Sequence, residues 1–197
     1  MPSGSPAWWR RGHRLFARLA AAVGAHPRRT FRKIPRMGNS GVGSVRDSQR
    51  SAVYTWERAL PAWPGPPLSL FECQELVARV WHDHLEAPAP RLTDGRSRRT
   101  ACYVYEDHEI RLPRWSRTVM VVLHEAAHAI LWSSIPTAAG HGPEYARLYL
   151  DMLERYAGVD ADVARWRGSR QRPRRVAFAP AGVVPTIRER AQLKLWY

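Results

Sequence analysis

Apolar residues recur at helical spacing once the chain passes residue 46, and this pattern predicts two helices. Asp47 or Ser48 is placed to cap the first helix and Pro61 to end it. Its apolar positions follow a period of about 3.6 residues: Val53, Trp56 and Leu60. The second helix opens with the capping box Ser69-x-x-Glu72 and closes before Pro88. One stripe of the second helix is apolar or aromatic: Cys73, Leu76, Val77, Val80, Trp81 and His84.

From Leu92 the alternation changes to a period of two, which is typical of short strands. Asp94-Gly95 is a turn signal, and a polar turn at residues 106–108 separates two further strands at 101–105 and 109–112. We therefore expect a small antiparallel sheet in the middle of the chain.

Two more helices follow the sheet. Ser116 is placed to cap a strongly apolar helix that runs through Trp132, and Pro143 occupies a favoured first position of the next helix, which Gly158 stops. The apolar positions of the last helix keep one face: Tyr145, Leu148, Tyr149, Met152, Leu153 and Tyr156. Helices and strands thus occupy separate parts of the chain, which predicts an α+β fold.

The formal net charge of +14 is concentrated at the two ends of the chain. Residues 1–46 hold ten basic residues and no acidic one, and residues 169–197 hold seven against one, which leaves −2 for residues 47–168. We expect one domain at 46–168 between a basic, disordered arm at 1–45 and a basic, Pro- and Arg-rich tail at 169–197.

The remaining composition indicates an ordinary reducing-compartment protein. Cys73 and Cys102 lie in apolar patterns without a CxxC partner, so both are expected to be buried thiols rather than ligands or a disulfide. No run approaches the roughly 20 apolar residues that span a bilayer. We expect a cytoplasmic monomer that does not bind membranes.

The apolar helix carries His124-Glu125-Ala126-Ala127-His128, an HExxH pentapeptide. Residues four apart share one helix face, so His124 and His128 are placed to hold one ion, and neutral imidazole suits Zn²⁺. Glu125 is adjacent rather than on the same row, which favours general-base chemistry over coordination. Without a metal, the helix would bury this carboxylate with no partner, at a cost of several kcal/mol.

A catalytic zinc takes three protein ligands and keeps a fourth position for water, so a further ligand is needed downstream. His141 precedes the last helix, where a short loop can fold that helix back beside the first. Glu144, one turn into the helix, is the competing ligand and would make a His-His-Glu site. We predict one zinc ion per chain, held by His124, His128 and His141.

HEAAH followed by His141-Gly142-Pro143-Glu144-Tyr145 resembles the SprT-like and Spartan zinc metalloproteases over roughly residues 100–157. The resemblance implies a compact zincin-like, minimal metallopeptidase domain with a small sheet packed on the HExxH helix. It also implies His141 as third ligand and Glu125 as base. The chain lacks the CxxC…CxxC zinc ribbon of the Spartan pattern.

A second resemblance covers most of the middle of the chain. Residues 46–50 with Val53-Tyr54-x-Trp56-Glu57, the stretches at 101–103 and 112–115, and HGPEY are similar to a small bacterial family of metallohydrolases of unassigned substrate. Because the similarity begins at Arg46, Met37, Val42 and Val45 are alternative starts of the translated chain.

Other polar residues give weaker signals. His82 and His84 face different sides of their helix, with His84 expected next to the core and His82 in solvent. His108 is expected to be a turn residue. Tyr145 and Tyr149 are placed to donate to an oxyanion, but their helical spacing favours core packing.

Two functions remain open on the sequence alone. The first is a zinc metallohydrolase that acts on a protein or peptide, with Glu125 as general base. The second is a nucleic-acid-associated protein whose basic arms contact phosphates non-specifically and whose zinc fold is mainly structural. The glutamate of HExxH favours the first, since a structural site does not need it.

Overall fold

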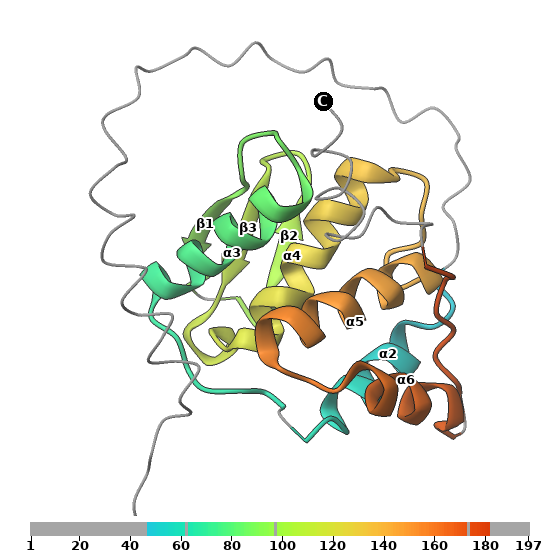
Figure 1. Cartoon of the computed structure of the whole chain (residues 1–197). Coiled ribbons are helices and arrows are strands. Elements are labelled where there is room, and N and C mark those ends of the chain that lie inside the picture. The colour runs from blue at the N-terminus through green and yellow to red at the C-terminus, as the bar shows by residue number, and fades with distance from the viewer. Residues whose placement is uncertain (1–46, 62, 97, 173, 182–197) are drawn as a thin grey trace, which may run out of the picture. The chain divides into compact units, whose positions relative to one another are not determined.

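The order of elements places a short run of strands between two groups of helices. A computed structural model describes residues 47–61, 63–96, 98–172 and 174–181, so both the predicted arm at 1–45 and the end of the predicted tail lie outside the described residues. The described elements are α2 (Arg50–Arg58), α3 (Leu70–His84), β1 (Arg91–Asp94), β2 (Cys102–Val104), β3 (Glu109–Leu112), the 3₁₀ helix η1 (Arg114–Ser116), α4 (Val119–Ser134), α5 (Pro143–Ala157) and α6 (Ala161–Arg170) (Figure 1). The α+β class is thereby confirmed.

The sheet is mixed, so the expected antiparallel sheet is wrong for one of its two strand pairs. The strand order is β1-β3-β2. β2 pairs antiparallel with β3, but β1 runs parallel to β3, with Leu92 opposite Ile110. Asp94-Gly95 does not close a hairpin, because the chain continues from β1 past β3 to the far edge before β2 begins. Alternation fixes which face a residue occupies and leaves strand direction open.

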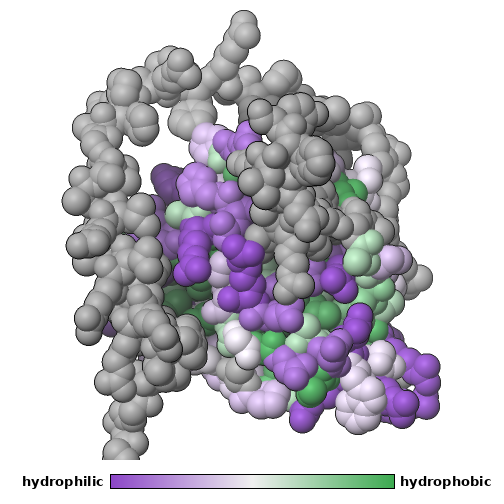
Figure 2. Space-filling view, viewed as in Figure 1, coloured by the Kyte–Doolittle hydropathy of each residue, from purple (hydrophilic) through white to green (hydrophobic). Residues whose placement is uncertain are grey.

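One face of the sheet packs on helices and the other carries ion pairs. Leu92, Ile110 and Leu112 are buried in the core, where α3 packs on β1 and α4 packs on β2 and β3. On the opposite face, Arg111 Nη2 lies 2.9 Å from Glu109 Oε2. Figure 2 shows the outside of the described residues, where hydrophilic side chains cover most of the visible surface.

Some helix ends lie where their capping residues predict them, and one does not. The capping box of α3 is confirmed, with the Glu72 amide donating to Ser69 Oγ at 3.1 Å and the Ser69 amide to Glu72 Oε2 at 2.7 Å. Gly158 ends α5 in the left-handed conformation, φ 66°. Ser116, the expected cap of α4, lies in η1 instead and donates to the Pro113 carbonyl oxygen at 2.8 Å. Helix α4 begins three residues later, after Thr118.

Helix α4 is surrounded on several sides, which explains why its sequence is apolar almost throughout. It packs on α3, on α5 and on the sheet. From α5, the Tyr145 hydroxyl donates to the His124 carbonyl oxygen at 3.4 Å and the Tyr149 hydroxyl to that of Met120 at 3.1 Å. Both tyrosines are buried, which confirms core packing as their role in the fold.

The C-terminal segment belongs to the packed domain, although the expected domain ended at residue 168. Helix α6 has no counterpart among the predicted elements, and residue 168 lies inside it. Beyond α6, Val176 is buried, and its amide donates to the Gly168 carbonyl oxygen at 2.9 Å. The Ala179 amide likewise donates to the Pro143 carbonyl oxygen at 2.9 Å. The packed region therefore continues at least to residue 179.

The two cysteines do not form a disulfide. Both cysteines are free thiols, with Cys73 buried and Cys102 half-buried. Burial raises the pKa of the Cys73 thiol to about 11.

None of the described helices combines the length and the apolar character that crossing a membrane requires.

The C-terminal segment gives a first prediction. In the full chain, Val176→Asp is expected to lower the melting temperature by several degrees, because it places a carboxylate in an apolar contact at a cost of a few kcal/mol. Ala177→Asp is the matched control, since Ala177 is exposed. Thermal unfolding followed by circular dichroism measures both. Equal melting temperatures for the two variants would restore a domain boundary near residue 168.

Candidate metal centre

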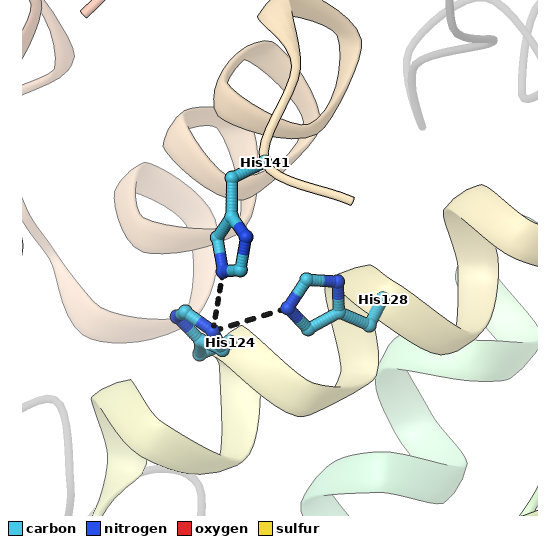
Figure 3. Close-up of side chains that lie close together, drawn as sticks. All are labelled: His124, His128 and His141. Carbon is cyan, nitrogen blue, oxygen red and sulfur yellow. Dashed lines mark hydrogen bonds between the residues drawn. The ribbon is translucent and has the colours of Figure 1, made fainter. Parts of the chain in front are cut away.

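Helix α4 brings the first two histidines together. His124 and His128 lie four residues apart and therefore one above the other on the same helix face. His124 Nε2 and His128 Nε2 are 3.2 Å apart. Figure 3 shows both rings directed to the same point beside the helix.

The third histidine comes from the loop between α4 and α5. His141 stands just before Gly142, the N-cap of α5, and its Nε2 lies 3.4 Å from His124 Nε2 (Figure 3). A Cβ atom at Gly142 would lie 3.1 Å from the Ala139 Cβ, so the lack of a side chain permits the tight loop that positions His141. The three ligand nitrogens all lie within 4.8 Å of one another.

The structure distinguishes between the two candidates for the third position. Among the described residues, the group of His, Cys, Asp and Glu side chains that could hold a metal ion consists of His124, His128 and His141. Glu144 lies in the first turn of α5 and is not a member of that group. The geometry thus favours the three-histidine set over the His-His-Glu set.

Two carboxylates stand behind the histidines, and the sequence analysis assigned neither to the site. His124 Nδ1 lies 2.7 Å from Glu57 Oε1, and Glu57 is 1% exposed. Asp47 or Ser48 was expected to cap α2, but that helix begins at Arg50 without a side-chain cap. Asp47 instead accepts from the His141 amide at 3.0 Å and lies 2.8 Å from His141 Nδ1.

One of these carboxylates left a signal in the sequence. Glu57 occupies the position next to Trp56 on the apolar face that Val53 and Leu60 also share, where a lone carboxylate is unusual. A buried acid at such a position needs a specific partner. Asp47 left no comparable signal, because an acidic residue before a helix is an ordinary cap.

The two carboxylates determine which ring nitrogens face the centre without a proton. When Nδ1–H of His124 donates to Glu57 and Nδ1–H of His141 donates to Asp47, both Nε2 atoms present lone pairs. In these tautomers the two Nε2 atoms, which lie 3.4 Å apart, have no proton between them. A cation placed between them converts this repulsion into coordination, and a carboxylate behind the imidazole is the usual partner of a ligating histidine.

The spacing of the nitrogens also fits a tetrahedral ion. Zinc–nitrogen bonds of about 2.0–2.1 Å at tetrahedral angles place two ligand nitrogens about 3.3–3.4 Å apart. The distances from His124 Nε2 to the other two Nε2 atoms are 3.2 and 3.4 Å. The three residues therefore fit a metal ion in donor type, and the two distances from His124 match tetrahedral coordination.

Burial keeps the ligands in the state that coordinates metals. It lowers the pKa of His124 to about 3, with smaller contributions from the charges of His141 and Arg50. Burial also lowers the pKa of His128 well below its usual value. Both imidazoles are consequently neutral at physiological pH, as metal binding requires.

Glu125 points to the sheet rather than into the group of nitrogens. Its Oε2 accepts from the Tyr103 amide of β2 at 2.9 Å, so the expectation that it would be buried without any partner is wrong. Burial nevertheless raises the pKa of Glu125 to about 8, against the effect of that hydrogen bond. Within the described residues, no protein donor bonds the other carboxylate oxygen, Oε1.

Aromatic rings enclose the histidines. The Tyr54 ring stacks on His124 with a centroid distance of 5.4 Å and an interplanar angle of 10°. Tyr145 stacks on His128 at 4.5 Å and 27°. Tyr54, which is half-buried, entered the sequence analysis only within a resemblance and is the third residue of the site that was not assigned there.

The remaining histidines of the described chain lie outside this group. His84 is buried and His82 is exposed, as expected. His108 occupies its turn with φ 47°, its Nδ1 3.0 Å from the Tyr103 hydroxyl and its Nε2 3.1 Å from the Pro88 carbonyl oxygen. These contacts account for His108 as a structural residue.

The fold and the site together define an α+β protein with a largely buried three-histidine group that could hold a metal ion. Comparisons with known protein families, with characterised proteins and with solved structures found no match to this chain.

The site predicts one tightly bound metal per chain. Purified protein reconstituted with zinc is expected to retain one equivalent after dialysis, and His124→Ala, His128→Ala or His141→Ala is expected to lose it, because two imidazoles alone hold zinc weakly. His82→Ala, on the exposed side of α3, is the control. Elemental analysis gives the stoichiometry. A full equivalent retained by His141→Ala would remove His141 from the ligand set.

The carboxylates behind the imidazoles predict a graded effect. Glu57→Gln and Asp47→Asn are each expected to weaken zinc binding by about 10- to 100-fold while the stoichiometry stays at one, because the orienting hydrogen bonds weaken but all ligands remain. Competition with a chromophoric chelator measures the affinity. Asp151→Asn, which changes a carboxylate on α5 that pairs with Arg147, is the control. Unchanged affinity in both variants would show that neither carboxylate tunes the site.

Proposed function

We propose that this protein is a zinc-dependent hydrolase, peptidase-like in its substrate, with His124, His128 and His141 as ligands and Glu125 as general base. The observation that carries the proposal is the convergence of three ligand nitrogens beside a glutamate that follows the first of them in the chain. A buried helix with two ordinary core histidines has no reason to recruit a third from a loop.

The number of ligands favours a catalytic over a structural site. Structural zinc sites are closed by four protein ligands, whereas catalytic sites use three and leave one position open. Within the described residues, the metal-binding group has three members and no fourth His, Cys, Asp or Glu joins it. This supports a site at which a water molecule or a substrate oxygen completes the coordination.

The position of Glu125 suits a base. The Tyr103 amide holds one carboxylate oxygen, which fixes the side chain and leaves Oε1 to accept a proton from water. When bound, zinc supplies a lowered water pKa and polarisation of the scissile carbonyl. A divalent charge nearby also favours the ionised carboxylate, against the burial that raises the pKa of Glu125 to about 8.

The substrate class rests on a resemblance rather than on geometry. HEAAH and HGPEY resemble the SprT-like and Spartan metalloproteases, and a protein or peptide amide is accordingly the proposed substrate. The nucleic-acid alternative depends on basic arms that lie mostly outside the described residues, so it stays a prediction.

The proposal is tested at Glu125. Glu125→Gln keeps the size of the side chain and an oxygen for the Tyr103 amide but removes the base, so zinc content should be unchanged while casein hydrolysis falls by about 10²- to 10⁴-fold. His124→Ala should lose both zinc and activity. The measurements are metal content and release of labelled casein peptides.

Glu144→Gln is the matched control, because Glu144 is a half-buried glutamate beside the site that lies outside the metal-binding group. It should keep both properties. Loss of zinc in Glu125→Gln would make Glu125 a ligand, and full activity in that variant would exclude it as the base.

A further inference from the structure

A pocket lies at the carboxyl ends of the two parallel strands, β1 and β3. It has a volume of about 650 Å³ and is lined by residues that follow β1 and β3, including Arg96, Arg98, Arg114 and Arg117. None of its lining residues is a histidine of the metal centre or Glu125. The segment from β3 through η1 to α4, which forms one wall, can be followed in Figure 1.

Hydrogen bonds and one close contact fix the backbone at the floor of this pocket. The Gly95 amide donates to the Leu112 carbonyl oxygen at 3.2 Å. A Cβ atom at Gly95 would lie 2.8 Å from Pro113 Cδ, so only glycine permits this close approach. Arg117 Nε donates to the same Leu112 carbonyl oxygen at 3.2 Å. These contacts fix the backbone from which Arg114 and Arg117 extend, whereas Arg96 and Arg98 lie in the loop between β1 and β2.

The charges around the pocket are unbalanced. Four arginines face one carboxylate, Asp94, which pairs with Arg117 at 2.7 Å and Arg96 at 3.0 Å. Within the described part of the chain, the Arg98 guanidinium contacts Cys102 Sγ, at 3.9 Å, and no carboxylate. The Arg114 guanidinium has no hydrogen-bond or ion-pair partner among the described residues. One carboxylate cannot neutralise four guanidinium groups, so the pocket attracts an anion and repels a metal cation.

A flat aromatic ring stands beside these cations. Trp115 lines the same pocket and is 63% exposed, although tryptophan carries a large apolar surface that normally seeks the core. Planar guanidinium groups bind phosphate oxygens in pairs, and exposed aromatic rings stack on nucleobases. A volume of about 650 Å³ also suits a ligand of nucleotide size.

We propose that this pocket binds a nucleoside phosphate, with Arg114 and Arg98 around the phosphate and Trp115 stacked on the base. The nucleoside phosphate is either free or part of a nucleic-acid strand, because both present the same phosphate and the same ring. This proposal does not depend on the proposed hydrolase activity. The pocket is the site at which the protein recognises the nucleoside phosphate.

The test measures binding to the full-length protein. Adenosine monophosphate is titrated by calorimetry, with adenosine and inorganic phosphate as partial ligands. One equivalent of adenosine monophosphate should bind, more tightly than either partial ligand and more weakly as salt rises, because phosphate contacts are screened. Arg114→Gln and Trp115→Ala should each weaken binding by about tenfold, from the loss of a charged hydrogen bond or of base stacking.

The chain offers a matched control in the Arg165-Trp166 pair of α6. Trp166 is 58% exposed, and neither residue lines the pocket. Arg165→Gln and Trp166→Ala repeat the same chemical changes elsewhere and should leave binding unchanged. They also retain every basic residue outside the described part of the chain, so non-specific contacts there cancel in the comparison.

Two further arms identify the source of the ligand. If adenosine monophosphate displaces a bound, labelled single-stranded oligonucleotide, the ligand belongs to a nucleic-acid strand. If adenosine monophosphate binds and the oligonucleotide does not, the ligand is a free nucleoside phosphate. The proposal is overturned if adenosine monophosphate does not bind, or if the Arg114 and Trp115 variants bind it as well as the α6 variants do. Equal competition by an acidic peptide, unaffected by Trp115→Ala, would overturn the nucleoside assignment.

Discussion

The structure depends on one constraint: α4 carries two imidazoles and a carboxylate into the interior of the domain, and each needs a partner there. His124 and Glu125 are buried within a helix that packs on α3, α5 and the sheet. An unpartnered polar group in such a place costs about 1–3 kcal/mol, and an unpaired charge costs more. These partners come from separate elements: Glu57 from α2, the Tyr103 amide from β2, and His141 from the loop before α5. Asp47 in turn contacts His141.

These partners are held in place by packing far from the histidines. Helix α2 is fixed by Trp56, which is fully buried, meets the rings of Tyr149 and Phe178 edge-on, and donates from Nε1 to the Ala164 carbonyl oxygen at 2.8 Å. The helix that delivers Glu57 is thus docked by α5, α6 and the C-terminal segment together. Formation of the site and folding of the domain are therefore coupled, as is typical of sites whose ligands come from separate elements.

The sequence predicted what depends on local spacing and missed what depends on distant contacts. The HExxH pair and His141 could be found because helical periodicity and ligand chemistry are visible along the chain. The capping box of α3 and the span of α5 from Pro143 to Gly158 were equally local. The direction of β1 was missed, because alternation is the same for parallel and antiparallel strands. Asp47 was misassigned because a cap and a partner of histidine use the same carboxylate, and only the fold decides between them.

Charge balance favours a cation at the histidine group. Behind and beside the histidines lie the buried carboxyl groups of Glu57 and Glu125, and burial raises the pKa of each to about 8. Without a cation, the interior can tolerate these groups only by favouring their protonated forms. A cation held by the histidine nitrogens favours the ionised form of both carboxyl groups. The arginine pocket has the opposite imbalance, with four cations around one carboxylate at an open surface. The same physical rule therefore assigns a cation to the buried centre and an anion to the exposed pocket.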